Sequence, residues 1–216
     1  MKRVAMAKKY RRYDWTKCAF WDESGFDLFP TPNLKNDIVW DRKGTEYRYE
    51  KMAHPPSFTF GTAITVHGPT KLVPYEGRID ADKYIEMVDK VISDINKKFK
   101  GKHWTWVHDG ARPHIARKTQ AHLVKIVPDV FPSKDWAPNS PDENPAENAF
   151  GYLDAKVQEK GAQSLRVLKA TVSKAWNEIT PEFCWKAIEA IPKRLEQIIQ
   201  TGGEYVYELK DNKKSK

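Results

Sequence analysis

Cysteine is scarce in this sequence, with only Cys18 and Cys184 among 216 residues. The two lie far apart and show no metal-ligand spacing, which argues against a disulfide framework and against a zinc module. No apolar run approaches the roughly 18 residues that a membrane span needs. The basic start at residues 1–10 lacks the apolar core of a secretory signal. We therefore expect a protein of a reducing compartment that is not secreted.

Three common catalytic motifs are also missing. The sequence contains no Gly-x-x-x-x-Gly-Lys-Ser/Thr loop, no Gly-x-Gly-x-x-Gly fingerprint and no Gly-x-Ser-x-Gly elbow. The first two cradle the phosphates of bound nucleotides and the third presents a serine nucleophile. Their absence argues against nucleotide-dependent enzymes and serine hydrolases. The 40% of apolar residues are enough for a folded core.

Positive charge is in excess, with a formal net charge of +8 at pH 7 and an isoelectric point of about 9.3. This balance favours polyanionic partners, nucleic acid above all, although many soluble proteins are basic for no specific reason. Arg42, Lys43 and Arg48 lie in a polar, irregular stretch. They are candidate DNA contacts, with a solvated face as an equally good explanation.

Hydrophobic periodicity divides the chain into a strand-rich first half and a helix-rich second half. The predicted strands cover residues 16–21, 26–29, 57–67, 71–75, 103–108 and 130–131. The predicted helices cover residues 80–100, 114–126, 165–178 and 181–200, and a further helix begins at Pro145 with Asn144 as its N-cap. A strand–helix–strand step joins the two halves, which predicts one α/β domain with a mixed sheet.

Three acidic residues stand where predicted strands end or a helix begins. Asp22 follows the first strand, Asp109 follows the strand over 103–108, and Glu147 lies in the first turn of the helix that begins at Pro145. Side chains at such places project into shared crevices. Three carboxylates brought together repel one another unless cations lie between them, and oxygen-preferring divalent ions meet that need.

Each acid also has a purely structural explanation. Asp22 and Asp109 could cap turns of the chain, because aspartate accepts hydrogen bonds from backbone N–H groups just after it. Glu147 lies three residues after Asn144, which is the spacing of a capping box. The chemical interpretation therefore depends on the three acids acting together.

The acids lie in sequence blocks that resemble those of the Tc/mariner DNA transposases. The stretch CAFWDESGF is similar to the family's first catalytic block, VHDGARPHIA to the second, and WAPNSPDENPAENAFGYL to the third. Between them, VWDRKGTEY and HGPTKLVPYEGRIDADKYIEMV match the family's middle, and IPKRLEQIIQTGGEYVYE resembles its C-terminal end. The resemblance covers nearly the whole chain.

This resemblance implies an RNase H-like α/β fold with a mixed, roughly five-stranded sheet flanked by helices. It places the catalytic domain at residues 13–208, between a basic segment at 1–12 and a lysine-rich tail at 209–216. Asp22, Asp109 and Glu147 would be the catalytic acids and would hold two Mg²⁺ or Mn²⁺ ions. The implied reaction is cleavage of phosphodiester bonds at transposon ends, followed by joining of the 3′-hydroxyl ends to target DNA.

The resemblance also implies partners and a place of action. The partners would be transposon-end and target DNA, together with a second copy of the chain or a protein that supplies the DNA-reading part. The candidate DNA contacts are Arg42, Lys43, Arg48 and His114. Ordering of the active-site loop is the alternative for His114. The chain would act in the nucleus of a eukaryote and otherwise in the cytoplasm.

The sequence departs from the family pattern in two ways. The gap between Asp109 and Glu147 holds 37 residues, which is longer than in many Tc-type members, whereas the 33 residues before Glu143 come closer to the usual spacing. Motif and helix position still favour Glu147, because it faces the positive end of the helix dipole. The paired helix-turn-helix units of the family are missing before the first block. We therefore expect a fragment, a truncated copy or a subunit that borrows its DNA reader.

Two other functions compete with a transposase. A domesticated or decaying remnant would bind DNA or a partner without cutting, which the missing reader favours and the intact acids disfavour. A different RNase H-like nuclease, such as a host ribonuclease, would not need the SPDENPAE block.

Overall fold

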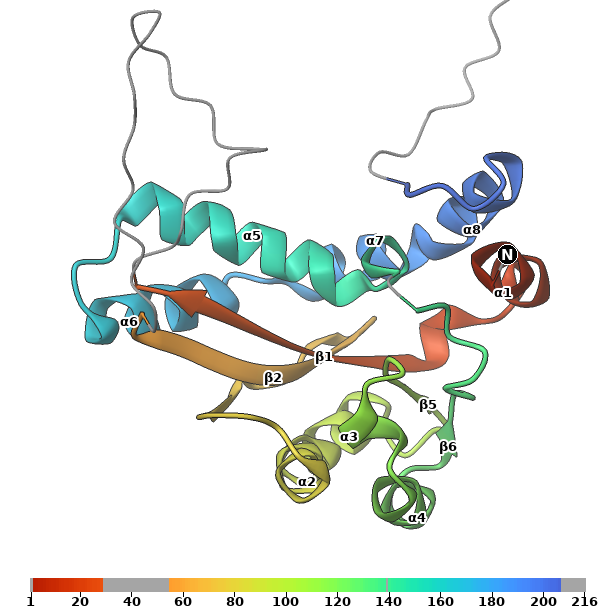
Figure 1. Ribbon diagram of the computed structural model, residues 1–216, viewed down its shortest axis with the longest axis horizontal. Coiled ribbons are helices and arrows are strands. Elements are labelled where there is room, and N and C mark those ends of the chain that lie inside the picture. Colours follow the sequence, from red (N-terminus) through yellow and green to blue (C-terminus); the bar gives the residue numbers. More distant parts are fainter. Residues whose placement is uncertain (1, 29–54, 139, 207–216) are drawn as a thin grey trace, which may run out of the picture.

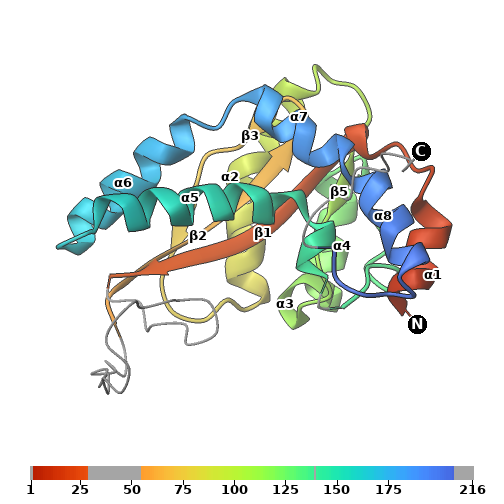
Figure 2. The ribbon, with the colours of Figure 1, turned by 90° about the horizontal axis from the view of Figure 1, so that it is seen from above.

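The strands form one sheet with helices on both faces (Figures 1 and 2). The computed structural model describes residues 2–28, 55–138 and 140–206. The strands are β1 (Cys18–Asp27), β2 (Ser57–Thr65), β3 (Gly68–Pro69), β4 (Val73–Tyr75), β5 (Thr105–Val107) and β6 (Asp129–Val130). They lie in the order β3-β2-β1-β5-β6, with β4 also paired to β2. β1 is antiparallel to β2 and parallel to β5, so the predicted mixed α/β sheet is confirmed, with six strands.

Helices cover the sheet in two layers. They are α1 (Lys2–Tyr10), α2 (Ala81–Lys98), α3 (Arg112–Ile115), α4 (Arg117–Ile126), α5 (Pro145–Lys160), α6 (Leu165–Asn177), α7 (Pro181–Glu189) and α8 (Ile191–Gln200). In Figure 1, α2, α3 and α4 lie below the sheet, and α5, α7 and α8 lie above it. α6 packs into the same core as α5, α7 and α8. α1 packs against α8 and buries Met6, Ala7 and Tyr10 in the same core. None of the described helices is both long and apolar enough to cross a membrane.

Alternation along β1 divides its apolar side chains between two cores. Phe20 packs on the side of α5 to α8, whereas Trp21 packs on the side of α2 and α4, and both are buried. Gly61 on β2 lies against the Trp21 ring, where an added Cβ would overlap the indole and Met87. Only glycine allows this close approach.

β1 is longer than the sequence predicts. The prediction ended a strand at residue 21, placed a turn after it and began a partner strand at residue 26, but one strand continues to Asp27. Antiparallel pairing with β2 extends from Phe20 opposite Ile64 to Asp27 opposite Ser57. This distant partner satisfies the backbone of the acidic stretch. Asp22 therefore lies within a strand and not at a turn, so the predicted turn is wrong, although Asp22 Oδ1 does accept the Glu23 backbone N–H at 2.9 Å.

Two predicted helices are each divided in two. The helix expected over 181–200 breaks after Glu189, because Pro192 has no N–H to donate to the Ile188 carbonyl and α8 starts afresh. The helix expected over 114–126 breaks at Ala116, whose backbone is extended (φ −56°, ψ 139°). The short helix α3 is thereby separate from α4, and it carries His114 toward the sheet.

Candidate active site

Strand register brings Asp22 and Asp109 together. β1 and β5 run parallel, and Phe20 pairs with Val107. Asp22 and Asp109 each stand two residues further along, so they continue on the face of the sheet that α5 covers. Both acids line one cavity on that face.

Glu147 reaches the same cavity from the first turn of α5. Asn144 caps this helix as predicted, because its Oδ1 accepts a hydrogen bond from the Ala146 backbone N–H at 3.0 Å. The Asn144 Nδ2 also donates to Asp22 Oδ2 at 2.8 Å, across 122 residues of sequence. The start of α5 is thus tied directly to the first acid.

The capping-box explanation of Glu147 is wrong. In a capping box the glutamate would accept a hydrogen bond from the backbone N–H of the N-cap residue. Here the Asn144 N–H donates to the Pro141 carbonyl at 3.0 Å. The Glu147 carboxylate has no hydrogen bond or ion pair with any described residue and is exposed where α5 meets the cavity. It is therefore available to a ligand.

The cavity concentrates negative charge. Its volume is about 380 Å³, and its walls are Asp22, Asp109, Gly110, Ala111, Trp136, Ala137, Pro138, Ser140, Pro141, Asn144 and Glu147. Burial raises the pKa of Asp22 well above its ordinary value, and the charges of Glu23, Glu147 and Asp109 raise it further. Partial burial also raises the pKa of Glu147. Such a cluster favours a bound cation, which would relieve the repulsion.

His114 holds Asp109 in place from α3. Its Nδ1 lies 2.6 Å from Asp109 Oδ1, and its Nε2 lies 3.1 Å from Glu23 Oε1. Burial alone would lower the pKa of His114, but the hydrogen bonds to Asp109 and Glu23 and their charges raise it to about 9. A protonated ring donates from both nitrogens, as a bridge between two carboxylates requires. With 3% of its surface exposed, His114 fits loop ordering better than a DNA contact.

Asp109 is the one acid of the three that pairs with a histidine. Its Oδ1 accepts the Ala111 N–H at 2.9 Å in addition to the His114 bond. Burial raises the pKa of Asp109, but the hydrogen bond and charge of His114 outweigh that effect and leave the pKa below its ordinary value. Asp109 is therefore the most readily ionised member of the set.

Glu23 is a site residue that the sequence did not predict, because it pairs with the histidine that holds Asp109. It follows Asp22 directly, so on an extended strand it points to the opposite face. There its Oε1 accepts a hydrogen bond from Trp21 Nε1 and pairs with His114. The only sequence signal was its place in the Asp-Glu-Ser triplet, because the partner His114 lies 91 residues away.

Glu143, the rival for the third acid, does not line the cavity. Its side chain is fully buried, and neither carboxyl oxygen has a hydrogen-bond partner among the described residues. Arg3 Nη1 lies 3.8 Å from its Oε1. Burial raises the pKa of Glu143 to about 8, the Arg3 charge opposes this and the Asp142 charge adds to it. The carboxyl is thus mostly protonated at neutral pH, which does not suit a metal ligand.

The remaining predicted site residues lie elsewhere in the chain. Arg42, Lys43 and Arg48 lie outside the described residues, and their assignment as DNA contacts stays a prediction.

The three acids suit a hard divalent cation by their chemistry. Mg²⁺ is usually held by one or two carboxylates, with water and substrate phosphate completing its shell. Within residues 2–28, 55–138 and 140–206, no three His, Cys, Asp or Glu side chains are gathered closely enough to bind a metal by themselves. The three acids thus line one cavity without forming a closed ligand set among the described residues.

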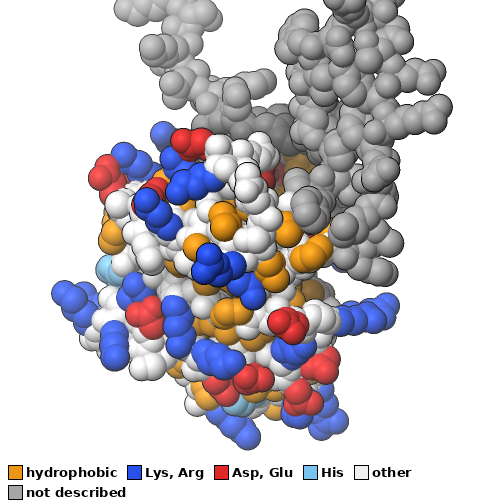
Figure 3. Space-filling view, turned by 90° about the vertical axis from the view of Figure 1, so that its left-hand side faces the viewer, with side chains coloured by type: hydrophobic (Ala, Val, Ile, Leu, Met, Phe, Trp, Pro, Cys, Tyr) orange, Lys and Arg blue, Asp and Glu red, His pale blue; other side chains and the backbone are white. Residues whose placement is uncertain are grey.

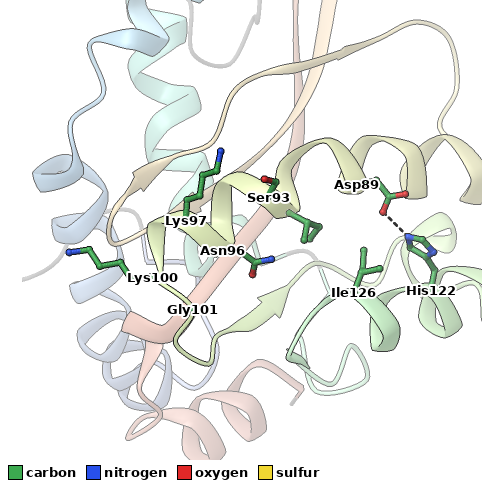
Figure 4. Close-up of a pocket in the computed structure, with 9 residues that line it drawn as sticks. Asp89, Ser93, Asn96, Lys97, Lys100, Gly101, His122 and Ile126 are labelled. Carbon is green, nitrogen blue, oxygen red and sulfur yellow. Dashed lines mark hydrogen bonds and ion pairs between the residues drawn. The ribbon is translucent and has the colours of Figure 1, made fainter.

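A larger hollow between α2 and α4 offers no comparable chemistry. It has a volume of about 840 Å³, and Figure 4 shows Asp89 and His122 at one end and Lys97 and Lys100 at the other. Of the described residues that line it, Asp89 alone carries a carboxylate, and that carboxylate lies 2.7 Å from His122 Nε2. This hollow therefore lacks the group of acids that the cavity of Asp22 has.

Known proteins match most of this chain. A family profile described as "DDE superfamily endonuclease" matches residues 17–169, which include all three acids. The Tc3 transposase of Caenorhabditis elegans is 25% identical over 211 residues, covering 94% of this chain and 61% of the relative. The Tcb1 transposase of Caenorhabditis briggsae is 23% identical, covering 93% of this chain and 75% of the relative. The chain thus spans less than two thirds of the Tc3 transposase.

Solved structures share the fold. The Mos1 transposase in a paired-end complex with the left transposon end has a TM-score of 0.74 at 17% identity, covering 94% of this chain and 62% of that chain. The catalytic domain of Mos1 mariner transposase has a TM-score of 0.65 at 17% identity, covering 94% and 93%. These likenesses confirm the predicted RNase H-like fold. With the profile match over most of its length, the chain belongs to the DDE superfamily endonucleases.

Proposed function

We propose that the chain is the catalytic domain of a DNA transposase, which cleaves phosphodiester bonds at transposon ends and joins the 3′-hydroxyl ends to target DNA. One observation carries this proposal: Asp22, Asp109 and Glu147 come from three separate elements and line one cavity. The names of the relatives support it, since they are transposases of transposable elements. Mos1 structures with Mn and with Mg support the use of a divalent ion.

The three acids would bind the metal ions, and Asn144 and His114 orient two of these acids. Asp22, Asp109 and Glu147 would hold two Mg²⁺ or Mn²⁺ ions, which supply an activated water or hydroxyl and stabilise the leaving oxygen. The Asn144 amide holds Asp22 and the His114 ring holds Asp109, so two acids are oriented in advance. The Glu147 carboxylate has no such partner among the described residues and can adjust as cleavage gives way to joining. A non-catalytic remnant would not need this repulsive cluster.

DNA contacts are expected on basic surfaces outside the cavity. α6 contains no acidic residue, and Lys160, Arg166 and Lys174 line a hollow along it. Figure 3 shows the end of the molecule where α6 lies, with Lys and Arg side chains spread over it. Cations on a helix without acidic residues favour contact with a phosphate backbone.

Binding to duplex DNA should weaken steeply as salt increases, because phosphate contacts release counterions. The double variant Arg166→Ala/Lys174→Ala should reduce the slope of log affinity against log salt by roughly one for each phosphate that is no longer neutralised. Fluorescence anisotropy over a salt series measures this slope. Lys90→Ala on α2, across the sheet, is the matched control and should leave the slope unchanged. An unchanged slope in the α6 variant would remove α6 from the DNA surface.

The assembly is proposed by analogy with the family. The working unit would be a homodimer, or a complex with a protein that supplies the DNA-reading part. For a eukaryotic source the place of action would be the nucleus.

A plasmid-nicking and end-joining assay tests the proposed function. In the presence of Mn²⁺ or Mg²⁺, the protein should nick supercoiled plasmid to give 3′-hydroxyl and 5′-phosphate ends, and should join a duplex with a recessed 3′-hydroxyl to the plasmid. Asp109→Asn is the matched inactive variant. Nicking of equal rate in that variant would assign the activity to another site or to a contaminant.

A further inference from the structure

Asp142 sits at the centre of contacts from three distant parts of the chain. Arg3 on α1 forms a two-pronged ion pair with it, at 2.8 Å from Nη1 to Oδ1 and 2.6 Å from Nη2 to Oδ2. The Val206 backbone N–H donates to Oδ2 at 2.9 Å, and Arg194 on α8 donates to the Asp142 carbonyl at 3.2 Å. The side chains of Arg3 and Asp142 are 13% and 7% exposed, so solvent screens the pair only weakly.

All five N–H donors of Arg3 are used. Besides Asp142, the guanidinium donates to Ser140 Oγ at 2.7 Å, to the Gly203 carbonyl at 3.0 Å and to the Glu204 carbonyl at 3.2 Å. Arg3 therefore holds residues 140–142 on one side and residues 203–204 on the other. A lysine has three donors around a point charge and could not reproduce this planar arrangement.

The segment that Arg3 binds, residues 140–142, leads directly to the active-site residues Asn144 and Glu147. Asn144, two residues after Asp142, donates to Asp22, and α5 then begins with Glu147 in its first turn. Arg194 adds a second tie from the same side, because its Nη2 donates to Asn148 Oδ1 at 3.1 Å. Both arginines lie behind the wall of the cavity, and neither lines it.

We propose that Arg3 and Asp142 form a clamp that sets the position of Asn144 and Glu147 relative to Asp22, so that α1 and the segment after α8 control the geometry of the active site. Arg3 is then a positioning residue, one that touches no reacting atom. The effect of the clamp on metal binding and cleavage rests on the proposed function. A purely structural tie between α1 and α8 would hold the same helices together without affecting the cavity.

Arg3→Lys tests the clamp, since it keeps the charge but loses the planar donors. Hydrogen exchange measured by mass spectrometry without metal should speed up at least 10-fold in a peptide over residues 140–148. In the same variant, Mn²⁺ affinity measured by electron paramagnetic resonance should fall roughly 3- to 10-fold. kcat for plasmid nicking should fall at least 10-fold with an unchanged KM for DNA.

Lys9→Ala is the matched control. Lys9 also lies on α1 and pairs with Asp135 at 2.7 Å, outside the clamped segment. This variant should leave exchange over 140–148, Mn²⁺ affinity and kcat unchanged. Asp142→Asn should behave like Arg3→Lys, and the double variant should add little to either single change, because both act on one contact.

The outcomes separate the two proposals. Unchanged exchange over 140–148 in Arg3→Lys, with only a lower melting temperature, would overturn the clamp. Faster exchange with unchanged Mn²⁺ affinity and kcat would overturn its role in the active site. A wild-type protein that neither binds Mn²⁺ nor nicks DNA would count against the proposed function, while the exchange rates would still decide whether Arg3 positions this segment.

Discussion

Glu147→Gln should lower the rate of DNA cleavage by a factor of roughly 1,000 or more while the protein stays folded. The amide keeps the size of the side chain but removes the negative charge that a divalent ion requires. Stability should change by less than about 0.5 kcal/mol, because the carboxylate is exposed and has no hydrogen bond or ion pair with any described residue. Nicking rates and thermal unfolding of the purified variant measure the two effects separately.

Glu143→Gln is the matched control and should keep most of the activity. Its effect should appear in stability, because burial raises the pKa of Glu143 to about 8. The charge of Arg3 opposes this rise and the charge of Asp142 adds to it. The unfolded side chain titrates near pH 4.3, so between about pH 4.3 and 8 the folded state binds the extra proton. The contribution of Glu143 to wild-type stability therefore falls as pH rises through that window. Above pH 8 the free energy of unfolding of the variant should exceed that of the wild type by roughly 2–5 kcal/mol, and near pH 4 the two should differ little.

The opposite result would change the assignment of the third acid. A dead Glu143→Gln variant beside an active Glu147→Gln variant would show that the spacing after Asp109 is a better guide than the motif and the helix. Loss of stability in Glu147→Gln with cleavage intact would point to a structural role for its carboxylate.

The features that the sequence predicted well are governed by neighbouring residues. The Asn144 cap and the start of α5 at Pro145 were predicted correctly. The helix that follows Asp80 was also predicted correctly, and it ends before Gly101, which has a φ of +72°. Caps and left-handed glycines act within a few residues of chain, so local patterns reveal them. The fold class followed from the order of such elements.

The features that the sequence did not predict depend on distant partners. β1 continues through its acidic stretch because β2 pairs with it, which no local pattern around Asp22 indicates. The contacts of Asn144 with Asp22 and of His114 with Glu23 span 122 and 91 residues. The roles of these neighbouring acids therefore could not be told apart by their sequence: Asp142 is bound by arginine, whereas Glu143 is buried and has a raised pKa.

Removal of divalent cations should abolish cleavage completely. The three acids of the cavity offer only oxygen ligands, and burial and mutual repulsion disfavour the ionised form of Asp22 unless a cation binds. Nicking should therefore stop in EDTA and return with Mg²⁺ or Mn²⁺. Ca²⁺ should support DNA binding with little cleavage, because its longer and more variable ligand distances align the reacting oxygens poorly. Full activity in EDTA would exclude a mechanism based on metal ions.

Thermal unfolding provides a measure of the same ions that does not depend on DNA. An ion that binds only the folded protein stabilises it by about 2.7 kcal/mol at 100 times its Kd. Mn²⁺ should thus raise the melting temperature of the wild type by several degrees, given about 2–4 °C per kcal/mol for a domain of this size. Asp22→Asn should lose most of this rise together with cleavage, because the amide removes the charge of one of the proposed ligands. Lys90→Ala should keep both. A Mn²⁺ response that survives in Asp22→Asn would place the ion elsewhere and would remove Asp22 from the ligand set, even if its substitution abolished cleavage.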